Sequence, residues 1–341
     1  MMAAQKLDLT QLREAARDRW PALLQAAGIA PNHLRKRHGP CPVCGGKDRF
    51  RFTDRDGRGC FVCNSHRPDG GDGFHLLADW LRCDFIGAAR FVADYLGGAA
   101  VLASAPDPAE TARRQAAEQA EQRRLWAKAR ADNAALWQAA KPVSAGSPVG
   151  RYLAGRGLLL NSNPKALRFH PALPYWHANG TQPVKLGSFP AMLAAVQAPS
   201  GEPIALHKTY LTEDGHKADV PSVKKWGSPS GPSKGAVVRL CAVGPKLAIT
   251  EGIETALAVH CANGLPVWAG LSAHGVAHAV LPPEAAEVFI FADHDAGGAG
   301  QQAADALATR LLAEGRTVRV LLPGSAGRDW LDVMTTKEAG A

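Results

Sequence analysis

The chain has 341 residues, of which 46% are hydrophobic, and a formal net charge of +8 at pH 7. This length predicts two or three domains, and the hydrophobic content is ample for globular cores. The sequence has no run of eighteen apolar residues and no secretory leader pattern, so we expect a cytoplasmic protein that does not enter a membrane.

Charge is distributed unevenly along the chain. Residues 31–70 carry nine Lys/Arg against four Asp (net +5), and residues 141–244 carry twelve against four acids (net +8). Residues 246–335 carry five against ten acids (net −5). A basic body with an acidic segment favours a polyanion that is held by phosphate contacts near a metal site. The seven cysteines, an odd number, favour reduced thiols over a disulfide framework.

Residues 7–30 predict one or two packing helices, and a metal site follows them. Cys41-Pro-Val-Cys44-Gly-Gly has the spacing of a zinc knuckle, and zinc takes four ligands in a tetrahedron. The second pair is either Cys63 with His66 or Cys60 with Cys63. Cys60 comes directly after a turn and belongs to the returning strand, whereas Cys63 and His66 follow that strand, where a second knuckle is expected. We therefore favour a zinc site of Cys41, Cys44, Cys63 and His66, with Cys60 in place of His66 as the alternative.

This segment resembles the zinc-binding domain at the N-terminus of satellite-phage-type primase-helicases. The resemblance is carried by the run from Cys41 to Phe50 and by Gly71-Asp-Gly-Phe74. In that family the fourth ligand is usually cysteine, so His66 departs from the pattern.

The hairpin between the two knuckles carries cations next to aromatic rings, a combination that suits single-stranded DNA. The candidate DNA contacts are Lys47, Arg49 and Arg51. By alternation Phe50 and Phe52 share one face. These two rings either stack on bases or form a small core around the zinc.

Two short helices over residues 74–97 complete a zinc-ribbon domain, residues 1–98. Residues 99–147 predict a helical linker, because Ala109 to Ala140 is rich in strong helix formers and has few apolar positions.

Residues 148–244 predict a basic α+β segment. Phe189–Val196 and Pro203–Leu211 predict antiparallel strands joined by a Pro-Ser-Gly-Glu turn, and Ala236–Leu240 predicts a further strand. Candidate phosphate contacts for template and nucleotides are His207, Lys208, Lys224, Lys225 and Arg239, with Arg151, Arg156 and Lys234 as weaker candidates. The Gly-Pro-Ser-Lys-Gly loop lacks Walker A spacing, so we expect a replicative helicase to act in trans.

Residues 245–341 predict a parallel sheet covered on both faces. Strands at Lys246–Thr250, Glu287–Ala292 and Thr317–Leu322 alternate with helices at Ile253–Cys261 and Gln301–Ala313. Right-handed crossovers bring the carboxyl ends of such strands to one edge, where ligands bind.

Four carboxylates follow these strands: Glu251, Asp293, Asp295 and Asp329. Any one of them could be a solvated acid or a helix cap, but four together repel one another unless a cation lies between them. The set therefore predicts a Mg²⁺ or Mn²⁺ site with room for substrate phosphates.

The pattern of Glu-Gly, then Asp-x-Asp, then a further Asp resembles the Toprim domain, which bacterial-type primases, topoisomerases and some nucleases share. Three sequence segments resemble the Toprim domain of phage and plasmid primases in particular: Thr250-Glu-Gly-Ile-Glu-Thr-Ala, Ala292-Asp-His-Asp-Ala-Gly-Gly and Gly327-Arg-Asp-Trp-Leu-Asp. The basic segment before it resembles, more loosely, the N-terminal half of a primase core. The resemblance implies a multidomain α/β chain with a zinc ribbon, a helical linker, an α+β subdomain and a Rossmann-like Toprim sheet.

These observations predict a DNA primase that joins ribonucleotides (NTPs) on single-stranded DNA. Asp293, Asp295 and Asp329 would hold Mg²⁺ or Mn²⁺, and Glu251 would be a further ligand or a general base. Asp332, Glu254 and His294 are supporting candidates. The alternative for Glu254 is that it merely caps its helix. The alternatives are a Toprim-type nuclease that uses the same acids and a non-catalytic DNA-binding or helicase-loading protein.

Overall fold

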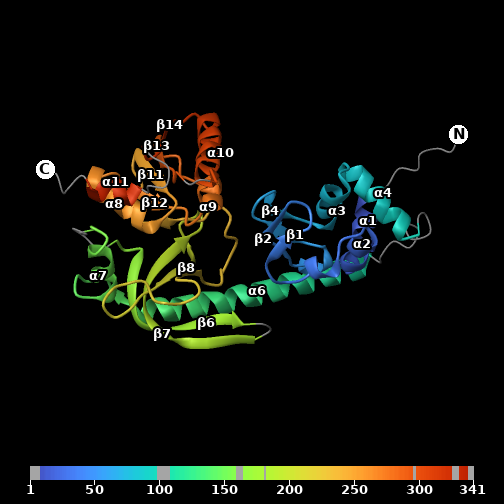
Figure 1. The fold of residues 1–341 in the computed structure, drawn as a ribbon, viewed down its shortest axis with the longest axis horizontal. Helices are drawn as coiled ribbons and strands as arrows, with labels where there is room; N and C mark the ends of the chain where they lie inside the picture. Colours follow the sequence, from blue (N-terminus) through green and yellow to red (C-terminus); the bar gives the residue numbers. More distant parts are fainter. Residues whose placement is uncertain are drawn as a thin grey trace. The chain divides into compact units, whose positions relative to one another are not determined.

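The structure, a computed structural model, forms two units, Met1–Gln119 and Ala120–Ala341 (Figure 1). The described residues are 8–97, 108–158, 164–179, 182–294, 297–324 and 330–336. None of the helices within these ranges is long and apolar enough to cross a lipid bilayer.

Within residues 8–97 the first unit combines four helices with a small antiparallel ribbon. Its elements are α1 (Leu9–Ala15), α2 (Trp20–Ala26), a 3₁₀ turn (Pro31–His33), β1 (Gly39–Cys41), β2 (Gly45–Phe52), a second 3₁₀ turn (Arg55–Gly57), β3 (Phe61–Cys63), β4 (Arg67–Gly71), α3 (Gly73–Leu81) and α4 (Phe85–Tyr95). The four strands pair in chain order, and both tight turns at one end of the ribbon carry Cys or His.

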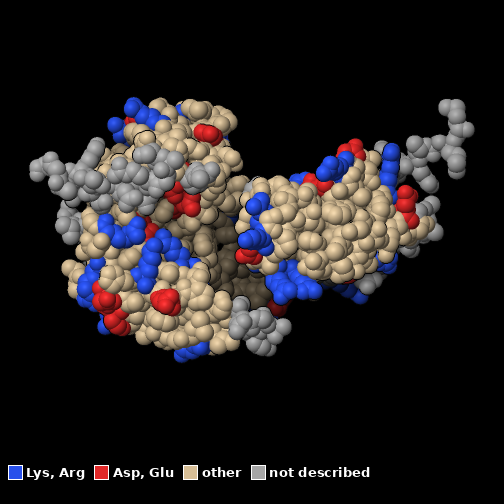
Figure 2. Space-filling model, in the orientation of Figure 1, with Lys and Arg blue, Asp and Glu red and all other residues tan. Residues whose placement is uncertain are grey.

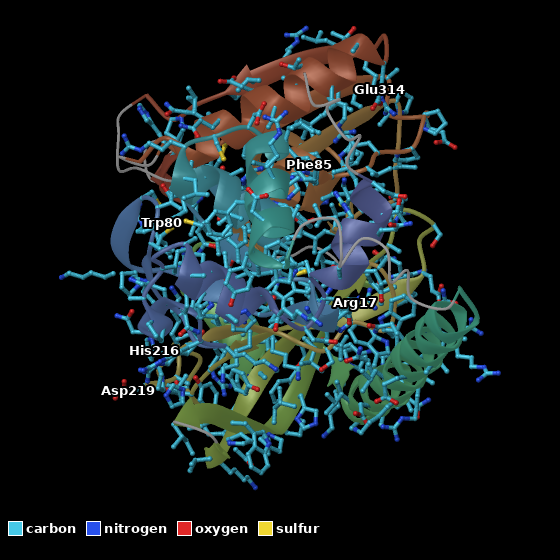
Figure 3. The ribbon with its side chains drawn as sticks, turned by 90° about the vertical axis from the view of Figure 1, so that its right-hand side faces the viewer. Arg17, Trp80, Phe85, His216, Asp219 and Glu314 are labelled. Carbon is cyan, nitrogen blue, oxygen red and sulfur yellow. The ribbon has the colours of Figure 1, made fainter. Side chains whose placement is uncertain are left out.

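Aromatic rings form the core of this unit. Phe50 and Phe61 lie 5.6 Å apart between ring centroids, and Trp20 meets Phe74 edge-on at 4.7 Å. Trp80, labelled on α3 in Figure 3, donates its indole N–H to the Ala27 carbonyl at 2.8 Å. These contacts fix α2 and α3 against each other and against the ribbon.

Gly73 is required where α3 begins. A Cβ on this residue would lie 2.0 Å from the Trp20 ring, so only glycine lets the helix approach so closely. Asp72 caps the same helix by accepting from the His75 backbone N–H at 3.1 Å. The Gly-Asp-Gly-Phe motif is therefore a helix start that packs on Trp20.

Helix α6 (Pro108–Ala139) is the long helix that the composition predicted. Its last turns are more than an exposed connector, because Ala129 is buried and Leu136 and Trp137 pack on the sheet of the second unit. The Arg168 guanidinium lies 4.7 Å from the Trp137 ring and fixes this docking.

The second unit contains two five-stranded sheets. The first is antiparallel in the order β5-β6-β7-β8-β9 and has α7 beside it. These elements are β5 (Lys141–Pro142), α7 (Pro148–Ala154), β6 (Leu167–Asn179), β7 (Gln182–Gln197), β8 (Pro203–Tyr210) and β9 (Lys224–Trp226). The predicted pairing of the strands around Met192 and Thr209 is confirmed, since these two residues face each other in the register.

The second sheet has the order β10-β12-β11-β13-β14, in which β12, β11, β13 and β14 run parallel and β10 runs antiparallel at one edge. The elements are β10 (Val238–Arg239), β11 (Lys246–Thr250), α8 (Ile253–Asn263), β12 (Val267–Ala269), α9 (Ala273–His278), β13 (Glu287–Phe291), α10 (Ala299–Ala313), β14 (Thr317–Leu321) and α11 (Trp330–Thr336). Helices α8 and α11 cover one face of this sheet and α9 and α10 cover the other (Figure 1).

Two details differ from the sequence-based expectation. The strand around Val238 was expected in the basic segment, but it pairs with β12 and so forms the edge of the parallel sheet. At the opposite edge β14 is not fully covered, because the side chain of Val320 is 39% exposed. Apolar alternation alone does not distinguish an edge strand from a central one.

Candidate active site and zinc centre

The carboxyl ends of the parallel strands in the second unit form what we call the acidic edge. Two adjacent strands, β11 and β13, lead to it. β11 and β13 pair in register up to Thr250 opposite Phe291, and Glu251 and Asp293 follow these positions. Neighbouring strands lie about 4.8 Å apart. The structure therefore brings Glu251 and Asp293 to the same edge, as the sequence predicts.

Loop contacts hold the backbone on both sides of this edge. The Leu271 N–H donates to the Glu251 carbonyl at 2.8 Å, which ties the end of β11 to the loop after β12. At β13, a Cβ on Gly300 would come within 2.6 Å of the Asp293 carbonyl oxygen. Glycine at the start of α10 thus lets that helix begin directly against the aspartate.

Of the remaining residues predicted at this edge, the structure describes only some. Asp295 and Asp329 lie outside the described residues, and so does the side chain of Asp332. His294 is described, and its Nδ1 lies 3.1 Å from the Pro323 carbonyl oxygen in the loop that follows β14. This contact links the ends of β13 and β14, the two strands that precede Asp295 and Asp329.

A buried charge cluster lies at the first turn of α8, three residues after Glu251. The Glu254 carboxylate accepts from Lys224 Nζ at 2.9 Å and from the Tyr152 hydroxyl at 2.8 Å. Burial alone would raise the pKa of Glu254, but Lys224 and these hydrogen bonds outweigh it and lower the pKa to about 2. Glu254 therefore does more than sit at the start of its helix, because its carboxylate also binds Lys224 and Tyr152. It fixes the Lys224 ammonium beside the acidic edge.

Strand alternation divides the predicted phosphate-binding residues between two faces. His207 and Lys224 lie on the face toward Glu254, and burial together with Lys224 lowers the pKa of His207 to about 4. Lys208 and Lys225 pair on the opposite face, where Lys225 Nζ donates to the Trp176 carbonyl. The structure thus brings only His207 and Lys224 of these four residues to the Glu254 cluster.

Arg239 does not lie on either face of the antiparallel sheet, because it belongs to β10, the edge strand of the parallel sheet. Its guanidinium is 4.5 Å from the Trp268 ring, and it donates to the carbonyls of Ala198 and Pro199 at 3.0 and 2.8 Å. These contacts hold the turn between β7 and β8 against the edge of the parallel sheet.

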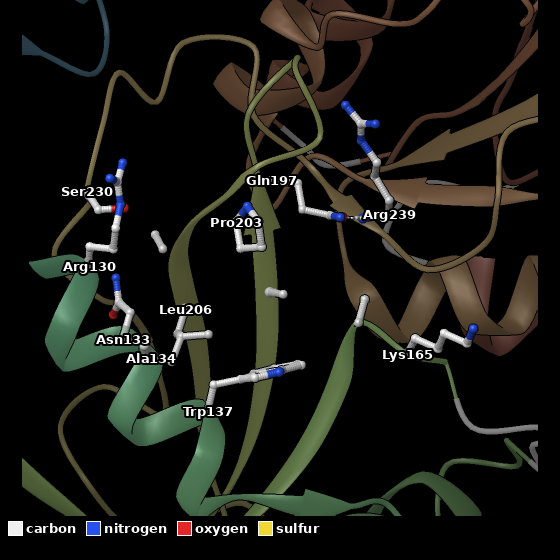
Figure 4. Close-up of a pocket in the computed structure, with 13 residues that line it drawn as sticks. Arg130, Asn133, Ala134, Trp137, Lys165, Gln197, Pro203, Leu206, Ser230 and Arg239 are labelled. Carbon is white, nitrogen blue, oxygen red and sulfur yellow. Dashed lines mark hydrogen bonds between the residues drawn. The ribbon is translucent and has the colours of Figure 1, made fainter.

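A cavity of about 440 Å³ lies between the end of α6, the antiparallel sheet and β10 (Figure 4). Small apolar side chains such as Ala134 and Ala205 form much of its lining, with Trp137 at one wall. Two of its cations are already engaged: Arg130 is paired with Glu202 at 3.0 Å, and Arg239 binds backbone carbonyls. The cavity is thus mainly an apolar recess.

In the first unit four metal-binding side chains converge at one end of the ribbon. One ligand atom from each of Cys41, Cys44, Cys63 and His66 lies within 4.8 Å of the others. The Cys44 and Cys63 sulfurs are 3.5 Å apart, and Cys41 Sγ lies 3.7 Å from His66 Nδ1. A tetrahedral zinc ion with bonds of about 2.0 to 2.3 Å needs donor atoms roughly 3.5 to 3.8 Å apart. The donor set therefore fits a structural Zn²⁺.

Cys60 lies away from this cluster. It precedes β3, whereas Cys63 ends that strand, and its thiol lies 3.6 Å from the Arg55 carbonyl oxygen. The geometry thus assembles the set with His66 that the sequence favours, rather than the alternative with Cys60.

The thiols of the cluster differ in acidity. Burial raises the pKa of Cys41 to about 12. At Cys63 the backbone N–H groups of His66 and Ser65 outweigh burial and lower the pKa to about 7. A zinc ion binds thiolates, so it would displace a proton from Cys41 more readily as the pH rises.

Of the three predicted cations of the ribbon, Lys47 and Arg51 are exposed and Arg49 is half-buried, whereas the aromatic rings are buried. Phe50 and Phe52 are 1% and 2% exposed, so the alternative that they stack on DNA bases is wrong. They form the small core beside the zinc cluster. Their neighbours Lys47 and Arg51 point to solvent, as alternation requires.

A basic recess of about 350 Å³ opens where the chain enters the ribbon. Arg35, Arg37, His33, His38 and Lys47 contribute to its lining, which contains no acidic residue. Figure 2 shows Lys and Arg gathered at the ribbon and, in the second unit, over the region of α7 and β8. The Arg35-Lys-Arg-His run before the first knuckle was a sequence signal for this recess.

Other residues at these sites had no such signal. Tyr152 reaches Glu254 across 102 sequence positions, and Asp79 on α3 faces His66 across the ribbon. Only the folded chain brings these pairs together.

Comparison with known families assigns both ends of the chain. Residues 36–74 match the zinc-binding domain of primase-helicase, and residues 246–339 match the Toprim domain. Residues 127–240, between them, match a domain of unknown function, DUF7146. The chain therefore carries an N-terminal zinc ribbon of the primase-helicase type and a C-terminal Toprim domain, the arrangement that the sequence predicts.

Solved primase structures show a general likeness to the chain. A DNA primase domain from Pseudomonas aeruginosa is 17% identical, with a TM-score of 0.42 over 62% of this chain and 75% of that one. The Aquifex aeolicus primase, with zinc-binding and RNA polymerase domains, is 14% identical, with a TM-score of 0.41 over 98% and 83%. The primase fragment of the bacteriophage T7 primase-helicase is 14% identical, with a TM-score of 0.36 over 88% and 94%.

Proposed function

We propose that this protein is a DNA primase that synthesises short RNA primers on single-stranded DNA. The observation that carries the proposal is the placement of Glu251 and Asp293 at the carboxyl ends of adjacent parallel strands in a Toprim domain. The primase-helicase type of zinc-binding domain in the same chain favours priming over DNA cleavage.

The reaction would join the 3′ oxygen of one nucleotide to the α-phosphorus of the next. The bond from that phosphorus to the β-phosphate oxygen breaks, and diphosphate leaves. Bound Mg²⁺ or Mn²⁺ would neutralise phosphate charge during this step. The residues that would hold it are Glu251, Asp293, Asp295 and Asp329. Glu251 is alternatively the base that takes the hydroxyl proton.

Lys224 and His207 would support the same step from the neighbouring sheet. Glu254 fixes the Lys224 ammonium, and the Lys224 side chain remains 44% exposed, so a triphosphate could reach it. His207 is buried beside it and neutral at pH 7, because its pKa is about 4. Because its side chain is buried, it would support the pair of Lys224 and Glu254 from the protein side without adding charge.

The zinc ribbon would hold the template strand. Lys47, Arg49 and Arg51, together with Arg35 and Arg37 of the basic recess, provide phosphate contacts. Because Phe50 and Phe52 are buried, we expect this binding to be mainly electrostatic and weakly dependent on base sequence. Strand separation would come from a helicase in trans.

A priming assay tests the proposal. The full chain is incubated with single-stranded DNA, labelled NTPs and Mn²⁺, and the products are separated by size. We expect short labelled oligoribonucleotides that require the template. Shortened DNA without labelled products would instead identify a Toprim nuclease, and neither product would favour a non-catalytic role.

A further inference from the structure

His66 is the one imidazole in a set of otherwise thiol ligands, and an imidazole needs its orientation fixed. A thiolate binds zinc through its single sulfur, whereas a neutral imidazole has a bare nitrogen on one side and an N–H on the other. His66 presents Nδ1 to the cluster, 3.7 Å from Cys41 Sγ. Its hydrogen must therefore reside on Nε2 when Nδ1 binds metal.

A carboxylate faces that second nitrogen. Asp79 Oδ2 lies 3.4 Å from His66 Nε2, a nitrogen that is shut off from solvent and makes no hydrogen bond in the structure, so the carboxylate is the group placed to accept its hydrogen. Asp79 projects from the last turn of α3, whereas His66 lies in the turn between β3 and β4. The Phe61 ring stacks beside the imidazole, with 6.3 Å between the ring centroids.

Asp79 is itself held in place. Arg67, the residue after His66, donates Nε to Oδ2 at 2.9 Å and Nη2 to Oδ1 at 3.0 Å. This two-point contact fixes the plane of the carboxylate. One of its oxygens, Oδ2, is thereby held 3.4 Å from His66 Nε2.

We propose that Asp79 is a positioning residue of the zinc centre, which keeps the hydrogen of His66 on Nε2 so that Nδ1 binds the metal. Outer carboxylates of this kind orient histidine ligands and typically contribute 10- to 100-fold to metal affinity. The proposal rests on the zinc site and not on the priming reaction. It also explains how histidine serves where the related domains usually have cysteine.

Zinc affinity of the full-length protein, measured by competition with a chromogenic chelator, tests this role. We expect Asp79→Ala to bind zinc at least tenfold more weakly, and Arg67→Gln to lose a smaller factor. Asp94→Asn, on the exposed side of α4, is the control and should match the wild type. A loss of less than threefold in Asp79→Ala would overturn the proposal.

A second background separates orientation of the imidazole from general support of the fold. In His66→Cys there is no imidazole to orient, so adding Asp79→Ala should change zinc affinity by less than threefold. A loss as large as in the wild-type background would show that Asp79 acts through packing alone and would contradict the proposal.

NMR provides a readout that does not depend on the cysteine variant. Long-range ¹H–¹⁵N spectra of the zinc-loaded wild type should show His66 protonated at Nε2 and bound through Nδ1. In zinc-saturated Asp79→Ala the Nε2 proton should exchange with water faster. Coordination through Nε2, or an unchanged exchange rate, would overturn the inference.

Discussion

The zinc ribbon and the acidic edge are built in contrasting ways. The ribbon collects its four donors from two tight turns within residues 41–66, around a core of a few aromatic rings. The acidic edge places Glu251 and Asp293 at the ends of strands that are buried between helices. A small core depends on its metal for stability, whereas a covered parallel sheet folds through its own apolar contacts. Loss of zinc should therefore unfold the first unit. Loss of the metal at the acidic edge should abolish catalysis there and leave the fold of the second unit intact.

The largest expected effect is on catalysis at the acidic edge. Asp293→Asn keeps the size of the side chain but removes its charge, so priming should fall by roughly a hundredfold or more. The thermal unfolding of the protein should change little, because the sheet core is untouched. Asp305→Asn, on the exposed side of α10, is the matched control and should prime normally. Normal priming by Asp293→Asn would refute the catalytic role of this edge.

Removal of zinc should have the next largest effect, and it should be confined to the first unit. Structural zinc sites contribute on the order of 10 kcal/mol of apparent binding free energy. Cys63→Ser, at a fully buried ligand, should abolish the cooperative unfolding transition of the first unit in calorimetry while that of the second unit persists. Cys60→Ser should retain about one zinc per chain. If Cys60→Ser loses the metal instead, the ligand set is wrong.

The Glu254 cluster gives the second unit its own dependence on pH. The pKa of Glu254 is depressed from 4.5 to about 2, so its stabilising contribution is complete above pH 4.5 and is lost as the pH falls toward 2. Glu254→Gln should remove this acid sensitivity and cost roughly 3 kcal/mol at pH 7, because it leaves the Lys224 ammonium without its carboxylate partner. Urea unfolding between pH 2 and 7 measures both. Glu284→Gln, at an exposed position, should keep the wild-type profile.

The smallest expected effect concerns DNA binding by the basic recess. Replacing Arg35 and Arg37 together by alanine should reduce the magnitude of the slope of log K against log salt by about 1.4, since each phosphate contact on a single strand contributes about 0.7. Fluorescence anisotropy with a thymidine oligonucleotide between 50 and 200 mM salt measures the slope. Arg90→Ala, on exposed α4, should leave it unchanged. An unchanged slope in the double variant would place the template elsewhere.

Much of the fold could be predicted because its signals are local. The Cys-x-x-Cys spacing, the apolar strands that end in acids and the helix-forming run of α6 each depend on neighbouring residues, and all three are present in the structure. Long-range pairings left weaker signals. The strand β6 went unpredicted, and β10 was expected beside the wrong sheet, because strand partners are chosen by tertiary packing rather than by local pattern.

The sequence by itself determined the chemistry available to this protein: a zinc-binding set of thiols and histidine, a row of strand-end carboxylates and two basic stretches. Only the tertiary structure decided how these groups are used. It buried Phe50 and Phe52, sent Lys225 to the face opposite Lys224, and brought Tyr152 to Glu254 and Asp79 to His66. The physical reason is that burial and the facing of side chains depend on which elements pack together, and residues far apart in the chain carry no local record of that choice.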